Sequence, residues 1–254
     1  VSNCNTLFIW FRQIWKKRTI IIMMIPVRDI KLNNTEFLDI VNEYKDAVMA
    51  RNNPGDLPRI AQVIPIKEKD ETLEEWTSDE YLELIMKQGR EHDGFPRKLK
   101  GHSGLKYTDY MEGRGAEKQV IEGADIYDAT SKLNKRLVEF LSCANNALNA
   151  VYPPGGFIAW HNNANAAGYN IICTWSENGD GWFDYWDLDK KERVRVPDVP
   201  GWQAKMTYFG SYDQPDKICY HAAGTNCYRI TVAFVFKEAD NFWEEVIEDL
   251  ENPL

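Results

Sequence analysis

The sequence predicts a mainly β fold with flanking helices (α+β), built on a sandwich or jelly roll. Seven strand-like segments with turn signals between them follow one another from residue 157 to residue 236. Aromatic residues are abundant, with 9 Trp, 12 Tyr and 11 Phe, and such residues favour strands that pack in a β core. Segments with apolar residues at helical spacing precede and follow this block, so helices are expected on either side of it.

Two helices are expected before residue 90. Thr35 can cap the first, whose apolar side chains recur at helical spacing and which ends at the turn over 52–55. Ser78 can cap the second, which ends at Gly89. Between them, residues 60–66 favour a short strand at a sheet edge, because the proline within this run cannot donate to a ladder.

The stretch over 89–125 is rich in glycine and charge and shows no periodicity, so we expect a loop insert near the mouth of a site. A long helix follows it and ends at the turn over 152–156. The apolar stripe of this helix consists of Leu133, Leu137, Phe140, Leu141, Ala144, Leu148 and Val151.

The seven strands are expected over 157–163, 169–176, 182–187, 193–197, 204–209, 218–223 and 228–236. Asp240 can cap a last amphipathic helix, whose apolar face carries Phe242, Trp243, Val246, Ile247 and Leu250. We therefore expect a single domain over 27–254. It is divided into a helical part over 27–152, a β core over 153–237 and a helix over 239–251.

Residues 1–26 are expected to be a leader or a disordered N-terminus. Within them, four basic side chains interrupt the apolar run over 7–25, and the remaining apolar stretches are too short to span a bilayer. No small-residue cleavage site follows the apolar run, which argues against a signal peptide. No membrane association is expected.

The amino-acid composition bears on which binding partners and which cellular compartment are expected. The net charge of −9 argues against a general nucleic-acid binder, because contacts with phosphates supply most of that affinity. Basic residues do cluster over 97–106, which is more typical of a solvated loop. The five cysteines are odd in number and form no C-x-x-C motif, which is typical of a reducing compartment and favours a cytoplasmic location.

Two histidines stand out among the four in the chain. His161 and Asn163 are two residues apart on a predicted strand, so their side chains are expected on one face. His221 lies sixty residues further on, at the end of another strand-like run. Two imidazoles and an oxygen donor make an open-sided site that suits non-haem Fe(II). His92 and His102, in the glycine-rich stretch, are expected to be loop residues.

Arg229 begins a run that is apolar on both faces, as in an interior strand. A guanidinium placed there needs an anion, because an unpaired buried charge is very costly. The anion could be an Asp or Glu of the protein. It could also be the carboxylate of a small ligand that Arg229 holds and Thr231 hydrogen-bonds, and the candidate metal pair favours this second interpretation.

Together these residues resemble the Fe(II)/2-oxoglutarate-dependent oxygenases, most closely a prolyl-4-hydroxylase-like branch with phage and marine viral members. The pattern of that family is His-x-Asp … His … Arg-x-Ser/Thr, and the resemblance covers roughly residues 150–237. One position departs from the pattern, because Asn163 stands where the family has a carboxylate.

The resemblance implies a double-stranded β-helix of the jelly-roll or cupin-like kind. It implies Fe(II) on His161, Asn163 and His221, with 2-oxoglutarate and O2 as co-substrates. The far carboxylate of 2-oxoglutarate would pair with Arg229 and Thr231. The reaction would hydroxylate a peptidyl (for example prolyl) or small-molecule substrate and release succinate and CO2. For a viral member the location would be the host cytoplasm.

Aromatic residues are candidates to line the co-substrate pocket. They are Tyr152, Tyr169 and Trp175, and Tyr169 is assigned to cofactor binding.

Asn163 leaves three alternatives open. It could bind the metal through its amide oxygen, or bind nothing and leave a two-histidine site. It could also mark an open coordination position, as in oxygenase-like halogenases. Asp184 or Asp216 could supply the missing carboxylate instead.

Other functions stay open beside the hydroxylase. The chain could be a catalytically inactive β-helix binding module that has lost the metal carboxylate. It could be an isomerase or sugar-binding protein of the cupin type. A zinc site on Cys219, His221 and Cys227 is a further alternative.

Overall fold

The computed structural model describes residues 27–49, 72–103, 106–108, 119–120, 124–143, 145–163, 167–236 and 243–253. The expected leader over 1–26, the expected strand over 60–66 and the expected cap Asp240 lie outside the described residues. None of the described helices is long and apolar enough to span a membrane.

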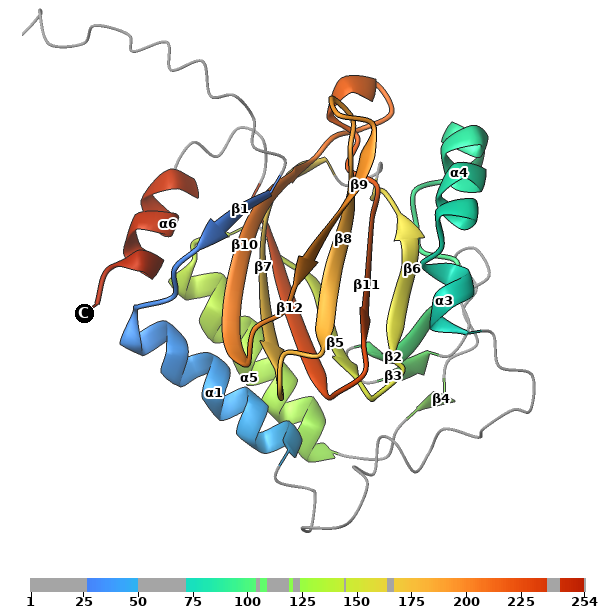
Figure 1. Cartoon of the computed structure of the whole chain (residues 1–254). Coiled ribbons are helices and arrows are strands. Elements are labelled where there is room, and N and C mark those ends of the chain that lie inside the picture. Colours follow the sequence, from blue (N-terminus) through green and yellow to red (C-terminus); the bar gives the residue numbers. More distant parts are fainter. Residues whose placement is uncertain are drawn as a thin grey trace, which may run out of the picture.

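Two antiparallel sheets of five strands each form the centre of the fold (Figure 1). Sheet A has the order β1-β10-β7-β12-β5, and sheet B has the order β2-β6-β11-β8-β9. The strands of sheet A are β1 (Val27–Ile30), β10 (Gly201–Phe209), β7 (Gly168–Ser176), β12 (Arg229–Phe236) and β5 (Asn145–Tyr152). Those of sheet B are β2 (Leu99–Ser103), β6 (Phe157–His161), β11 (His221–Thr225), β8 (Gly181–Asp187) and β9 (Glu192–Pro197).

The chain passes back and forth between the sheets, which defines a double-stranded β-helix. The strands β5, β7, β10 and β12 belong to sheet A, and β6, β8, β9 and β11 belong to sheet B. Strand β2 pairs with both β5 and β6 and joins the two sheets on one side. Two short strands, β3 (Lys106–Thr108) and β4 (Gln119–Val120), extend β2 outward. The predicted mainly β, jelly-roll fold with flanking helices is confirmed.

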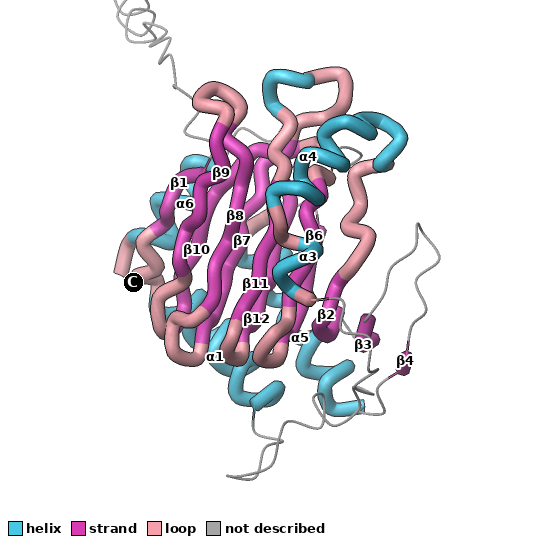
Figure 2. Tube along the Cα trace, turned by 45° about the vertical axis from the view of Figure 1, so that its right-hand side comes forward, coloured by secondary structure: helices cyan, strands magenta, loops and turns pink. Residues whose placement is uncertain are grey.

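Helices cover the outer face of each sheet (Figures 1 and 2). On sheet A lie α1 (Thr35–Met49), α5 (Ala124–Phe140) and α6 (Trp243–Glu251), which bury the largest hydrophobic cluster of the described residues. On sheet B lie α3 (Leu73–Trp76) and α4 (Asp79–Gln88), with the 3-10 turn η1 (Gly89–His92) continuing α4. A second 3-10 turn, η2 (Pro215–Lys217), lies in the β10–β11 connection. Side chains such as Phe37 are fully buried, and each contributes about 1.5–3 kcal/mol of burial free energy.

All seven strands predicted over 157–236 are present, as β6 to β12. The Ser78 hydroxyl accepts from the Tyr81 N–H, and Gly89, at φ 53°, ends α4 as expected. The first helix is capped differently. The side chain of Asn34, one residue before Thr35, accepts from the Phe37 N–H at 2.9 Å.

The helix expected to run through Val151 is wrong in its second half. The helix α5 ends at Phe140, and Ser142 takes a left-handed conformation at φ 49°, which stops a helix. Residues Asn145–Tyr152 instead form β5, paired with β12 and β2. A short apolar run fits both periods, and the long-range pairing with β12 decides between them.

The part of the chain expected to be helical also supplies strands to both sheets. Strand β1 closes one edge of sheet A, and β5 belongs to the β-helix itself, so the β core begins before residue 153. The expected loop insert over 89–125 is structured in its described portions, as η1, β2, β3, β4 and the start of α5.

Candidate functional site

A β-bulge in β6 turns His161 into the interior of the β-helix. In the pairing of β6 with β11, His161 lies opposite His221 and Ile158 lies opposite Ala223. Between these two pairs, β6 has two residues, Ala159 and Trp160, where β11 has only Ala222. Ile158 packs inside the barrel while Trp160 packs outside against α4, and the extra residue returns His161 to the inner face.

The two imidazoles lie together at one end of the barrel. Their ring centroids are 4.0 Å apart with an interplanar angle of 50°, and both side chains are buried. His161 Nδ1 is 2.8 Å from the Ala159 carbonyl oxygen, and His221 Nδ1 is 2.9 Å from that of Cys219. Metal-binding histidines are commonly oriented in this way, with one ring N–H donated to a backbone carbonyl.

Burial keeps both imidazoles neutral. It lowers the pKa of His221 to about 4. It also lowers the pKa of His161 well below its ordinary value, and the neighbouring His221 adds to this effect. Only a neutral imidazole can bind a cation, so near pH 7 protons compete little at this pair.

Asn163 reaches the histidine pair from a position beyond the strand. Strand β6 ends at His161, so the expectation that His161 and Asn163 share a strand face is wrong. The backbone of Asn163 is left-handed at φ 51°, and its N–H donates to the Gly94 carbonyl at 2.8 Å. Its Nδ2 lies 3.4 Å from His221 Nε2. A half-turn of the amide about its last torsion would present Oδ1 there instead.

The two imidazoles and the Asn163 amide suit a divalent cation of borderline softness, but none of them carries a negative charge to balance that of the cation. Among the described residues, no three His, Cys, Asp or Glu side chains form a metal-binding group. Two imidazoles and one neutral amide oxygen remain, and such a set holds a cation less strongly than one with a carboxylate. Asp184, an alternative carboxylate, is occupied by ion pairs with Arg193 and Arg195.

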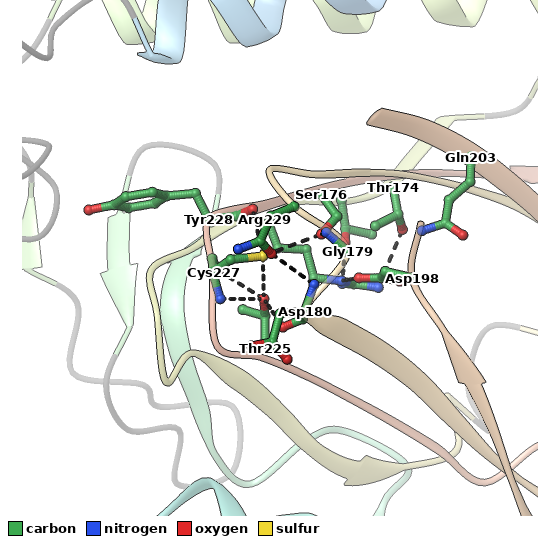
Figure 3. Close-up of polar contacts among 12 residues, drawn as sticks. Thr174, Ser176, Gly179, Asp180, Asp198, Gln203, Thr225, Cys227, Tyr228 and Arg229 are labelled. Atoms are coloured by element: carbon green, nitrogen blue, oxygen red, sulfur yellow. Dashed lines mark hydrogen bonds and ion pairs between the residues drawn. The ribbon is translucent and has the colours of Figure 1, made fainter. Parts of the chain in front are cut away.

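Arg229 finds its anion within the chain (Figure 3). Its Nε donates to Asp198 Oδ2 at 2.7 Å, and both side chains are almost fully buried, at 3% and 1% exposed. Nη1 donates to the Thr231 hydroxyl at 2.6 Å, and Nη2 donates more weakly to Thr174 at 3.4 Å. Asp198 lies in the β9–β10 connection, and no pattern in the sequence marks it.

The guanidinium of Arg229 points along the barrel toward the histidines. His221 opens β11 and Arg229 opens β12, so the two begin at opposite ends of the barrel (Figure 1). Thr231 lies two residues further along β12, and the bond to it directs Nη1 back toward the histidine end.

Two further polar atoms near Arg229 are buried and lack a hydrogen-bond partner among the described residues. They are the Tyr152 hydroxyl and the Gln203 side-chain nitrogen. The Arg229 guanidinium lies 5.7 Å from the centre of the Tyr152 ring, and Gln203 pairs across the sheet with Thr174. The guanidinium has five N–H donors, and three of them donate to described residues. The other two can donate to a ligand.

Tyr169 and Trp175 are not brought to this site. Both lie on the outer face of β7, because alternate residues of a strand face opposite sides and Thr174 faces inward. The Tyr169 ring stacks on Trp243 of α6 with centroids 4.5 Å apart. Of the residues expected to bind co-substrate, Arg229, Thr231 and Tyr152 lie together.

Comparisons with known proteins gave only distant structural similarities. No protein-family model and no curated protein matches the sequence. A Pseudomonas putida prolyl-4-hydroxylase is 15% identical with a TM-score of 0.31, covering 63% of this chain and 85% of its own. A viral collagen prolyl hydroxylase from Paramecium bursaria Chlorella virus-1 is 12% identical with a TM-score of 0.30, covering 67% and 98%. A protein described as OsALKBH1 is 14% identical with a TM-score of 0.34, covering 83% and 96%.

Proposed function

We propose that this chain is an Fe(II)/2-oxoglutarate-dependent dioxygenase. The observation that carries the proposal is the pair of buried, neutral imidazoles inside a double-stranded β-helix, each oriented by a backbone carbonyl. Asn163 adds an amide at the same point. His161, His221 and Asn163 would hold the metal, which supplies the activation of O2 for oxidising 2-oxoglutarate and a substrate C–H bond.

The chain's own part is to bind and orient the co-substrate. Arg229 directs its terminal nitrogens toward the histidine end, where the far carboxylate of 2-oxoglutarate would receive them. The Tyr152 hydroxyl, which lacks a partner among the described residues, would donate to the same carboxylate. Asp198 holds Nε of Arg229 and so fixes the plane of the guanidinium.

The substrate we propose is a peptide or a small molecule, hydroxylated with release of succinate and CO2. Net charge of −9 disfavours a polyanionic substrate such as a nucleic acid. The two prolyl hydroxylases described above make a prolyl peptide the first substrate to try.

A second candidate function is that of a catalytically inactive binding module. Two observations favour it. Asn163 withholds one negative charge from the metal site. Asp198 neutralises Arg229 within the chain, so this cation does not require an anionic ligand.

An anaerobic titration with Fe(II) and 2-oxoglutarate separates the two. The dioxygenase predicts a visible charge-transfer band from the metal–co-substrate chelate, and the band should be lost or need far more 2-oxoglutarate in Arg229→Ala. No band in the wild type, with a band in Asn163→Asp, would identify the inactive module. No band in either variant would rule out the proposed metal site.

A further inference from the structure

Lys205 is a buried cation on the inner face of sheet A. Its side chain is only 10% exposed, although it lies on β10, the strand next to the edge of the sheet. Thr207, two residues further along, donates to the sulfur of Cys219, which precedes β11 of sheet B. Met206 instead packs in the cluster beneath the helices that cover sheet A. Because alternate residues of a strand face opposite sides, Lys205 faces the interior of the barrel.

The ammonium group of Lys205 is directed along the barrel toward the arginine end. Its Nζ donates to Gln203 Oε1 at 3.1 Å, and Gln203 lies two residues back on the same strand. The carboxylate paired with Lys205 belongs to Asp29 of the edge strand β1, which is 3.5 Å away and 81% exposed. An ion pair with so exposed a partner contributes little, whereas a buried charge needs close compensation. A lysine that only covered apolar surface would extend its ammonium to solvent.

A row of hydrogen-bonding side chains crosses sheet A at the level of Gln203. Gln203 lies opposite Thr174 of β7, and Thr174 lies opposite Thr231 of β12. Figure 3 shows Gln203 and Thr174 side by side at this level. Arg229 donates to both threonines from the far end of the barrel. Lys205 donates to Gln203 from the side of the histidines, so two cations from different strands converge on one row.

Lys205 changes the charge at this row. Asp198 neutralises Arg229, so that pair offers a ligand directed N–H groups but no net charge. Lys205 adds one positive charge, and water screens its interaction with the exposed Asp29 carboxylate. Since Gln203 accepts from Lys205 through Oε1, its amide presents the nitrogen as a donor. The row therefore combines a net positive charge with hydrogen-bond donors, which is what a carboxylate requires.

We propose that Lys205 supplies the positive charge that binds the far carboxylate of a dicarboxylic 2-oxo acid inside the barrel, while Arg229 supplies directed hydrogen bonds. This inference rests on the proposed function, because the 2-oxo acid end of the same molecule would be held at the histidines. Lys205 then determines specificity, since a 2-oxo acid without a second carboxylate gains nothing from it. It also weakens the case for an inactive module, because pairing of Arg229 with Asp198 does not remove all positive charge from the site.

Calorimetric titration of the Co(II)-loaded protein with 2-oxoglutarate and with 2-oxobutyrate tests the proposal. Co(II) takes imidazole and oxygen ligands as Fe(II) does. Both ligands have the 2-oxo acid end, but only 2-oxoglutarate has a second carboxylate. We expect Lys205→Met, which keeps the length of the side chain without its charge, to weaken 2-oxoglutarate binding about 10-fold or more and to leave 2-oxobutyrate binding unchanged. Lys135→Met, at an exposed position of α5, is the matched control and should behave as the wild type.

Equal losses for the two ligands, or no loss for either, would overturn the proposal, because Lys205 would then serve the fold alone. If Lys205→Met does not fold, Lys205→Gln makes the same test, since glutamine can still donate to Gln203 but carries no charge. A wild type that binds both ligands equally tightly would contradict this inference without touching the metal site. A wild type that binds neither ligand in the presence of Co(II) would instead refute the proposed function.

Discussion

The two ends of the barrel interior stabilise their buried polar groups in different ways. At one end Arg229 is charged, and the chain supplies Asp198, Thr231 and Thr174 to satisfy it. At the other end His161 and His221 are kept neutral by burial. A buried charge must be paired for the chain to fold, whereas a neutral imidazole can keep a nitrogen for a ligand. The arginine end should therefore govern stability, and the histidine end should govern metal binding.

The largest effect is expected from breaking the ion pair at the arginine end. Asp198→Ala leaves the Arg229 guanidinium buried and unpaired, which should lower the free energy of unfolding by about 3–5 kcal/mol. Denaturant unfolding measures this change. Asp213→Ala, which breaks an exposed ion pair with Arg90, is the control and should change stability little. A loss as small as that of the control would mean that Arg229 is not dependent on Asp198.

The next effect concerns pH at the histidine end. His221 has a pKa of about 4 in the folded protein and an ordinary value of 6.5 when unfolded. Between these values the unfolded chain binds more protons, so stability falls as the pH is lowered from about 6.5 to about 4. The expected contribution is about 3 kcal/mol.

Unfolding measured from pH 7 to pH 4 in the wild type and in His221→Phe tests this expectation. Phenylalanine keeps a ring to stack on Phe209, whose centroid is 4.5 Å from that of His221, and it cannot titrate. The pH dependence of the variant should be weaker. Equal slopes would show that His221 is not the group that titrates. His161 and His92, whose pKa values are also lowered by burial, would then account for the effect.

The sequence predicted the structural features that depend on neighbouring residues, and it missed those that depend on pairing between distant strands. Alternation and turn signals are local, and they predicted the strands from 157 onward. Strand β5 was misread as helix, because its apolar residues fit both periods and its partner β12 lies about eighty residues away. The bulge that turns His161 inward exists only in the pairing with β11, so no reading of residues 157–163 alone could contain it.

The candidate site shows the same division. His161, His221 and Arg229 were found because chemistry and spacing coincide at those positions. Asp198 is a single polar residue in a connecting segment, and only the folded chain reveals that it is buried beside Arg229. Tyr169 was placed wrongly, because the strand was identified correctly but its inward face was not.

A third prediction sharpens the contrast at the histidine end. Asn163→Asp adds the missing carboxylate at a left-handed position that Asp tolerates nearly as well as Asn. We expect Co(II) to bind at least about 10-fold more tightly, a gain of about 1.4 kcal/mol. Direct titration with Co(II) measures it, with Asn162→Asp as the neighbouring control. An unchanged dissociation constant would place the Asn163 side chain outside the metal's reach.

The smallest change in stability is expected from Tyr152→Phe. This substitution tests whether a ligand accepts a hydrogen bond from the Tyr152 hydroxyl at the arginine end. The Tyr152 hydroxyl is buried without a partner among the described residues, so its removal breaks no bond within them. The free energy of unfolding should stay within about 0.5 kcal/mol of the wild type.

Binding of 2-oxoglutarate should respond far more, because a hydrogen bond to a carboxylate contributes about 1.5–3 kcal/mol, or roughly 10- to 150-fold in affinity. Calorimetry in the presence of Co(II) gives the dissociation constant, and Tyr208→Phe, on the outer face of β10, is the control. Unchanged affinity would mean that the Tyr152 hydroxyl does not contact 2-oxoglutarate, which would contradict its proposed role.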